Sequence, residues 1–215
     1  LGSPSQAVGF LEQALEVATD DAQRADLLDQ AGKAATKAAR GDIAVGFLER
    51  ATEIRQTLGD RIALGRTIGL HASALTSARR REQAIALLEP AVAGLEDLSD
   101  DPVVVRLMLS LGRNLYLIEQ HDRGLELTER ALALAERLGL VDIAAEALET
   151  KGSIAVFAGR QWEARALLEG CRVLAEENDL PETALAASLM LASVIALDDP
   201  AAAVTLQRAG IAIAR

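Results

Sequence analysis

The chain has 215 residues, of which 50% are hydrophobic and only 2% aromatic, and its formal net charge is −10. A core at this length must be aliphatic, and this composition favours helix because Ala and Leu have high helix propensity. The negative charge argues against nucleic acid as a direct partner, since phosphate binding needs a basic surface.

Other features of the sequence bear on cellular location, membrane association and the extent of the chain. Cys171 is the only cysteine, so no internal disulfide forms and a reducing cytoplasm is the simplest location. The most apolar stretch, 184–197, is shorter than the roughly 20 residues of a membrane helix, so it predicts a buried helix and no membrane partner. The chain begins with Leu and ends on an apolar phrase without a stop pattern. We therefore expect a fragment of a longer protein.

One phrase is written twice, as AVGFLEQALEV at 7–17 and as AVGFLERATEI at 44–54. Its first small residue recurs at Ala84, Gly124, Ala164 and Ala202, with spacings of 37, 40, 40, 40 and 38 along the chain. A second small residue follows seven positions later in each copy, at Ala14, Ala51, Ala91, Ala131, Cys171 and Ala209. Residues seven apart share one helical face, so these small residues predict a close helix–helix contact.

A second helix precedes each of four copies. Twelve residues before the first small residue stand Gly32, Ala72, Gly112 and Gly152, again 40 apart. Short polar breaks separate the two helices, and Asp60, Asp101, Asp142 and Pro181 are residues typical of helix starts. The sequence thus predicts an all-α chain of about eleven helices in a single domain, 1–215. A leading helix at 5–18 is followed by helix pairs at 21–58, 60–97, 101–139, 141–178 and 181–215.

These spacings resemble the tetratricopeptide repeat, most clearly at Leu111, Gly112, Gly124 and Ala131. The resemblance covers nearly the whole chain and implies an α-solenoid of antiparallel helix pairs. Two features differ from the family: the units are 37–40 residues long, where the standard unit has about 34, and the aromatic positions are mostly aliphatic. Longer units of this kind are similar to arrays in bacterial multidomain transcription and signalling regulators.

The resemblance also implies a concave groove, lined by the first helix of each pair. The candidate groove residues are Lys33, Arg66, Arg106, Leu109, Arg113, Tyr116, Glu146 and Glu149. Arginine binds carboxylates in a bidentate manner, so Arg66, Arg106 and Arg113 are candidates to hold an acidic or C-terminal peptide segment. The alternative is that these arginines pair internally with Asp29, Glu146 or neighbouring carboxylates.

The residues that could act in catalysis give little support for an enzymatic function. His71 precedes a small contact residue and is expected to pack in the core, His121 falls in a turn, and Cys171 occupies a tight helix contact. No Cys and His spacing of the zinc type occurs, so no metal or cofactor is expected. Trp162 is expected to pack against the adjacent turn, although an exposed position would make it a docking anchor.

Two functional hypotheses remain. The first is a non-catalytic scaffold that binds a protein or peptide within a larger bacterial signalling or transcription regulator. The second is a self-association module, in which the solenoid ends, with Phe10 and Leu11 at one and Ile211 and Ile213 at the other, stack or pair as a homodimer.

Overall fold

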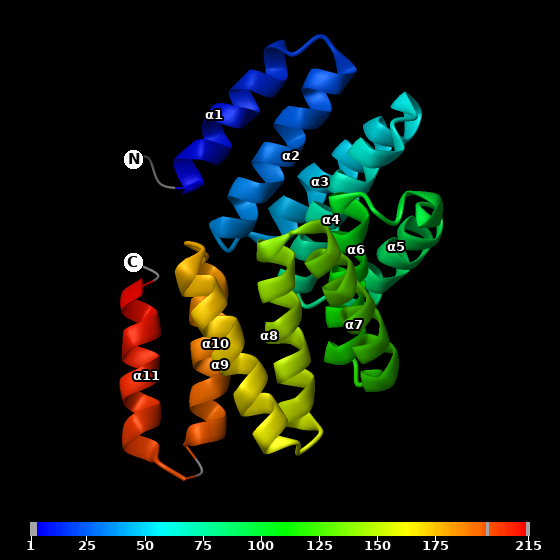
Figure 1. The fold of residues 1–215 in the computed structure, drawn as a ribbon. Coiled ribbons are helices and arrows are strands. Elements are labelled where there is room, and N and C mark those ends of the chain that lie inside the picture. Colours follow the sequence, from blue (N-terminus) through cyan, green and yellow to red (C-terminus); the bar gives the residue numbers. More distant parts are fainter. Residues whose placement is uncertain (1–3, 197, 214–215) are drawn as a thin grey trace. The chain divides into compact units, whose positions relative to one another are not determined.

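The computed structural model describes residues 4–196 and 198–213, and within these ranges the chain is entirely helical (Figure 1). The first helices are α1 (Pro4–Val17), α2 (Asp21–Lys37), α3 (Gly41–Leu58), α4 (Arg61–Ser77), α5 (Arg81–Ala93), the 3₁₀ helix η1 (Glu96–Leu98) and α6 (Pro102–Leu117). They are followed by α7 (His121–Leu138), α8 (Val141–Phe157), α9 (Gln161–Glu177), α10 (Pro181–Ile195) and α11 (Pro200–Ile213). The eleven α-helices in these ranges match the number expected from the repeat. None of the described helices is long and apolar enough to cross a membrane.

The chain divides into two compact units, Leu1–Ile118 and Glu119–Arg215. We call them the first and second unit. The boundary falls in the turn between α6 and α7, inside the predicted pair 101–139. The repeat spacing does not predict this boundary. The single domain over 1–215 stays a prediction.

Within each unit, consecutive helices pack as antiparallel neighbours (Figure 1). We call α2, α4, α6, α8 and α10 the A helices and the remaining α-helices the B helices. In the first unit α4 contacts both α2 and α6, and in the second unit α8 contacts α10. The A helices of a unit therefore form a continuous layer, and side chains on successive A helices can meet.

Aspartates cap several helices, and two of them, Asp60 and Asp101, were expected at helix starts. The carboxylate of Asp20 accepts a 2.8 Å hydrogen bond from the backbone N–H of Gln23, and Asp60 and Asp101 cap α4 and α6 in the same way. An N-cap carboxylate satisfies backbone donors that the helix leaves unpaired. Asp142 instead lies in the first turn of α8, whose N-cap residue is Leu140.

The turn between an A helix and the following B helix is the same in four repeats. It has three residues, and the middle one has a positive φ of 56° at Ala39, 62° at Arg79, 68° at Glu119 and 72° at Gly159. In the 38–40 turn the N–H of Arg40 donates back to the carbonyl of Ala35 over 2.9 Å. This is the Schellman ending, which places a left-handed residue just past the helix. Only Gly159 adopts this conformation without steric cost.

The small residues allow close helix contacts. At Gly152 on α8, an added Cβ would lie 2.7 Å from the Leu168 side chain of α9, and at Gly32 it would overlap Leu48 of α3 in the same manner. Gly112 is also buried, and Ala51, Ala131 and Cys171 are fully buried, whereas Ala14 and Ala91 are half-buried. Glycine at these positions of the A helix thus makes room for a leucine of the B helix that follows.

The predicted register of the last helix is wrong by one residue. Ala209 is exposed on α11, and the buried small residues are Ala203 and Gly210. The reason lies in element lengths: α10 has 15 residues where α8 has 17, and the turn after α10 is one residue longer. These two differences in length together shift the positions at which small residues of α11 are buried. The alanine run 201–203 offers several small residues, so the sequence alone leaves the register ambiguous.

Candidate functional site

Six of the eight predicted groove residues lie on A helices of the first unit. Lys33 on α2, Arg66 on α4 and Arg106 on α6 are exposed, and Arg113 is half-buried on α6. Because α2, α4 and α6 pack in succession, these cations belong to one layer of helices. We call this surface the A face of the first unit.

Leu109 and Tyr116 do not lie open on that face. Leu109 is 2% exposed and Tyr116 is 8% exposed. Both belong to α6, which also buries Leu107, Met108 and Leu111 and is therefore apolar around most of its circumference. These two residues contribute to packing, and the accessible part of the predicted groove is charged.

Glu146 and Glu149 lie on α8 and belong to the second unit. Both are half-buried, and Oε1 of Glu149 accepts a 2.9 Å hydrogen bond from the hydroxyl of Ser153 one turn further along. The structure thus distributes the predicted basic and acidic residues between the two units.

A polar cluster joins α2, α3 and α4, and its central residue, Arg55, was missed by the sequence analysis. Arg55 of α3 is buried and pairs with Asp26 of α2, and its Nη2 lies 3.8 Å from Oδ2 of Asp29. The fully buried hydroxyl of Thr67 on α4 donates to Oδ2 of Asp29 over 2.8 Å. Asp26 and Asp29 are in the family's groove positions, but Arg55 belongs to a B helix, where the resemblance implies no groove residue.

Burial and the neighbouring hydroxyl and cations act in opposite directions on the pKa of Asp29. Burial raises the pKa of the Asp29 carboxyl above its ordinary value, while the Thr67 hydrogen bond and the charge of Arg55 act in the opposite direction. Arg66 also lowers this pKa through its charge, although no ion pair between Arg66 and Asp29 is formed. Oδ1 of Asp29 and Nε of Arg55 are buried without hydrogen-bond partners. The cluster therefore holds an incompletely satisfied carboxylate.

A second hydrogen bond joins the next two A helices. The hydroxyl of Thr76 on α4 donates to Oδ1 of the buried Asn114 on α6 over 2.8 Å, and Nδ2 of Asn114 donates to the carbonyl of Ser110. Like Thr67 and Asp29, Thr76 and Asn114 are 38 residues apart. Polar side chains thus tie α2, α4 and α6 together.

The residues considered for catalysis take structural positions. His71 is buried between α3 and α4, burial lowers its pKa, and its Nδ1 lies 3.3 Å from Oγ1 of Thr52. Since the Thr52 hydroxyl donates to the carbonyl of Leu48, it accepts from Nδ1–H of a neutral imidazole. The buried thiol of Cys171 donates to the carbonyl of Ala145. Among the described side chains, no three His, Cys, Asp or Glu are gathered to hold a metal ion.

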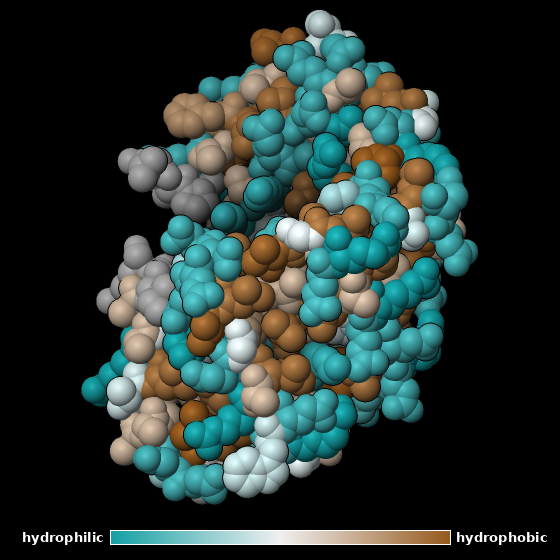
Figure 2. Space-filling view, in the orientation of Figure 1, coloured by the Kyte–Doolittle hydropathy of each residue, from teal (hydrophilic) through white to brown (hydrophobic). Residues whose placement is uncertain are grey.

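Several large apolar side chains of the second unit are exposed. Figure 2 shows hydrophobic residues over α8, α9 and α10, while hydrophilic residues cover α2. Its exposed large apolar side chains are Val141, Phe157, Trp162, Val173, Leu189, Val204 and Ile211. Trp162 is 84% exposed, so the expectation that it packs against the neighbouring turn is wrong.

No family model matches the sequence, and no curated protein is matched either. Solved structures do match. A Rap protein complexed with competence and sporulation factor has a TM-score of 0.83 at 17% identity over 95% of this chain, and this chain spans 57% of that one. A putative kinesin light chain with TPR-like repeats from Podosopora anserina has a TM-score of 0.67 at 20% identity, over 91% of this chain and 97% of its own.

A third structure is a signal transduction ATPase with numerous domains from Pyrococcus horikoshii, which contains a tetratricopeptide repeat sensor. It has a TM-score of 0.60 at 14% identity and covers 99% of this chain, which spans 39% of that protein. The fold of this protein is therefore that of a tetratricopeptide-like helical array, which confirms the resemblance seen in the spacing of its small residues.

Proposed function

We propose that this array is a non-catalytic module that binds a protein or peptide partner, in the cytoplasm and within a larger bacterial signalling or transcription-regulatory protein. Two solved structures of this fold support this context: the Rap protein is complexed with competence and sporulation factor, and the signal transduction ATPase has a tetratricopeptide repeat sensor. His71 and Cys171 hold internal hydrogen bonds, which supports a scaffold more than an enzyme.

The observation that carries the proposal is the A face of the first unit. In a protein of net charge −10, exposed Lys33, Arg66 and Arg106 stand on three successive A helices. Neither Lys33 nor Arg66 has an ion-pair partner among the described residues. Such cations favour a partner that presents carboxylates, either an acidic segment or a free C-terminus.

Fluorescence anisotropy with labelled hexapeptides tests this function. An acidic peptide is compared with its amide counterpart, in which Gln replaces Glu, and each is made with a free and with an amidated C-terminus. We expect the double variant Arg66→Glu, Arg106→Glu to weaken binding of the acidic peptide by at least about tenfold, since each charge-assisted contact contributes roughly 1.5–3 kcal/mol. Arg50→Glu is the control, because Arg50 is exposed on the B helix α3 and outside the A face. Equal binding by the double variant, with the helical circular dichroism preserved, contradicts the proposal.

Self-association through the array ends is the second candidate, because apolar side chains are exposed on both terminal helices. On α1, Phe10 is 71% and Val17 is 78% exposed, and on α11, Val204 is 47% and Ile211 is 44% exposed. The two members of each pair are seven residues apart and share a helical face. Leu11 is half-buried, and the side chain of Ile213 lies outside the described residues. Light scattering over a range of concentrations separates the candidates, since a strict monomer contradicts this one.

A further inference from the structure

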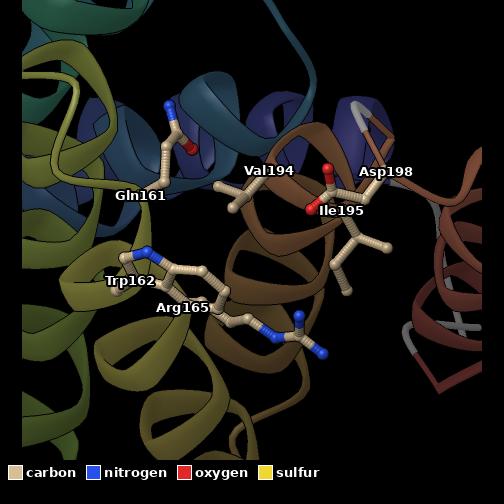
Figure 3. Close-up of a pocket in the computed structure, with 6 residues that line it drawn as sticks. All are labelled: Gln161, Trp162, Arg165, Val194, Ile195 and Asp198. Carbon is tan, nitrogen blue, oxygen red and sulfur yellow. The ribbon is translucent and has the colours of Figure 1, made fainter.

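A pocket of about 260 Å³ opens between the start of α9 and the end of α10, wholly within the second unit. Six residues line it, namely Gln161, Trp162, Arg165, Val194, Ile195 and Asp198 (Figure 3). It belongs to a different unit from the A face, and the proposed function does not use it.

The floor of the pocket is apolar and well supported. Val194 belongs to a core cluster with Ala164 and Leu168 of α9, and Ile195 packs against the same cluster. The indole of Trp162 forms one wall and extends into solvent, and within the described residues its Nε1–H has no acceptor. A rigid aliphatic floor beside an open aromatic face suits an alkyl chain that ends in a cation.

Two oxygen acceptors lie above this floor. Oε1 of Gln161 is buried and receives no hydrogen bond, and Figure 3 shows this oxygen turned toward Val194. The carboxylate of Asp198 approaches from the other side of Val194 in the same view. A buried acceptor without a donor costs free energy that a ligand N–H would recover. The pocket thus has an exposed charged acceptor, Asp198, and a buried neutral acceptor, Oε1 of Gln161.

Arg165 also lines the pocket but forms no ion pair with Asp198 in the described structure. In Figure 3 its side chain runs past Trp162 and the guanidinium ends below Ile195. Acidic residues also outnumber basic ones in the second unit, so the surrounding field favours a basic partner.

We propose that this pocket docks a lysine side chain presented by a partner protein. The alkyl stem lies on Val194 and Ile195 beside the Trp162 indole, and the ammonium donates to Oε1 of Gln161 and to the Asp198 carboxylate. An ammonium carries three tetrahedrally arranged donors that can reach two separate acceptors, whereas a planar guanidinium is suited to two oxygens of one group.

Trp162 is the only tryptophan of the chain, so its fluorescence reports directly on the pocket. The full chain is titrated with acetyl-Gly-Lys-Gly-amide and with matched peptides in which norleucine or glutamate replaces lysine. We expect saturable quenching or a shift of emission with the lysine peptide, and binding of the norleucine peptide at least about tenfold weaker, since it lacks the charge.

Variants locate the contact. Asp198→Asn is expected to weaken binding of the lysine peptide about tenfold, and Arg165→Gln to strengthen it by removing a like charge. Glu177→Gln is the control, because it removes one exposed charge from the far end of α9 and should leave binding unchanged. Circular dichroism checks that each variant is folded.

Four results would overturn the proposal. Equal binding of the lysine and norleucine peptides would show an apolar site without charge recognition. Preferred binding of the glutamate peptide, lost in Arg165→Gln, would show a carboxylate site. Binding of n-butylamine as tight as the lysine peptide would show a site for small amines and no docking surface. If emission stays constant with every peptide, the indole N–H resonance of Trp162 decides, and an unchanged resonance also overturns the proposal.

Discussion

The hydroxyl of Thr67 on α4 donates a 2.8 Å hydrogen bond to Oδ2 of Asp29 on α2, and so joins two successive A helices. Thr67 is fully buried, and Asp29 has only 13% of its side chain exposed. The bond offsets part of the cost of burying a carboxylate whose other oxygen has no partner. The proposed binding surface of the first unit therefore rests on a polar contact between repeats as well as on apolar packing.

Replacing Thr67 by Val tests this contact, because Val keeps the volume and removes the donor. We expect the free energy of unfolding to fall by about 1–3 kcal/mol, since the buried Asp29 carboxylate loses its hydroxyl partner. Urea denaturation followed by circular dichroism measures the change. Thr57→Val is the matched control, because the Thr57 hydroxyl is exposed and bonds only within its own helix. An equal effect in both variants would mean that the interhelical bond adds nothing to stability.

The raised pKa of Asp29 makes a prediction about pH. Because burial raises this pKa above 3.8 in the folded chain, the folded state favours the protonated carboxyl. The stabilisation linked to this group is fully present below the ordinary pKa and is lost as the pH rises through the raised value. In Asp29→Asn this titration is absent. The free energy of unfolding of the variant, relative to the parent chain, should therefore increase as the pH rises from about 3.5 to about 7.

Urea denaturation at several pH values measures that difference. If the free energy of unfolding of Asp29→Asn, relative to the parent chain, decreases as the pH rises, the attraction between Asp29 and Arg55 exceeds the cost of burying the carboxylate. Asp26→Asn serves as a comparison, because Asp26 also pairs with Arg55 but has 63% of its side chain exposed.

Two glycines of the second unit should respond oppositely to alanine. Gly152→Ala should destabilise the protein by about 1–3 kcal/mol, because the new Cβ would lie 2.7 Å from the Leu168 side chain. Gly170→Ala on α9 should stabilise it by about 1 kcal/mol, because Gly170 is exposed within a helix and an added Cβ meets nothing. Thermal and urea unfolding of both variants measure these changes. Stabilisation by Gly152→Ala would show that α8 and α9 are less closely packed than described.

The turns between paired helices offer a further comparison. Ala39 has a φ of 56° at the turn position that Gly159 occupies with a φ of 72° in another repeat. Ala39→Gly should therefore stabilise the protein by about 1 kcal/mol, and Gly159→Ala should destabilise it by a similar amount, because a Cβ is strained in the left-handed region. The two free energies of unfolding should change with opposite signs. Destabilisation by Ala39→Gly would show that added freedom of the unfolded chain outweighs the relieved strain.

The sequence was sufficient for the helical array because the pattern of small residues repeats in every copy. Gly32 and Gly152 are recognisable from spacing alone, and each faces a leucine sixteen residues further along. The candidate site was less predictable, because it depends on contacts between helices. Repeat position alone did not separate the exposed Arg106 from the buried Leu109 three residues later on α6. Arg55 was missed because its role depends on two aspartates of another helix.

The register of α11 can be tested by substitutions at neighbouring positions. Gly210 is buried, and an added Cβ would lie 2.9 Å from Cβ of Ser188 on α10, whereas Ala209 is exposed. Gly210→Ala should therefore destabilise the second unit by about 1–3 kcal/mol through overpacking. Ala209→Leu should change the free energy of unfolding by less than about 0.5 kcal/mol, as expected for a surface position. If Ala209→Leu is the disruptive change and Gly210→Ala is tolerated, the register read from the sequence is correct and α11 is rotated relative to the structure described.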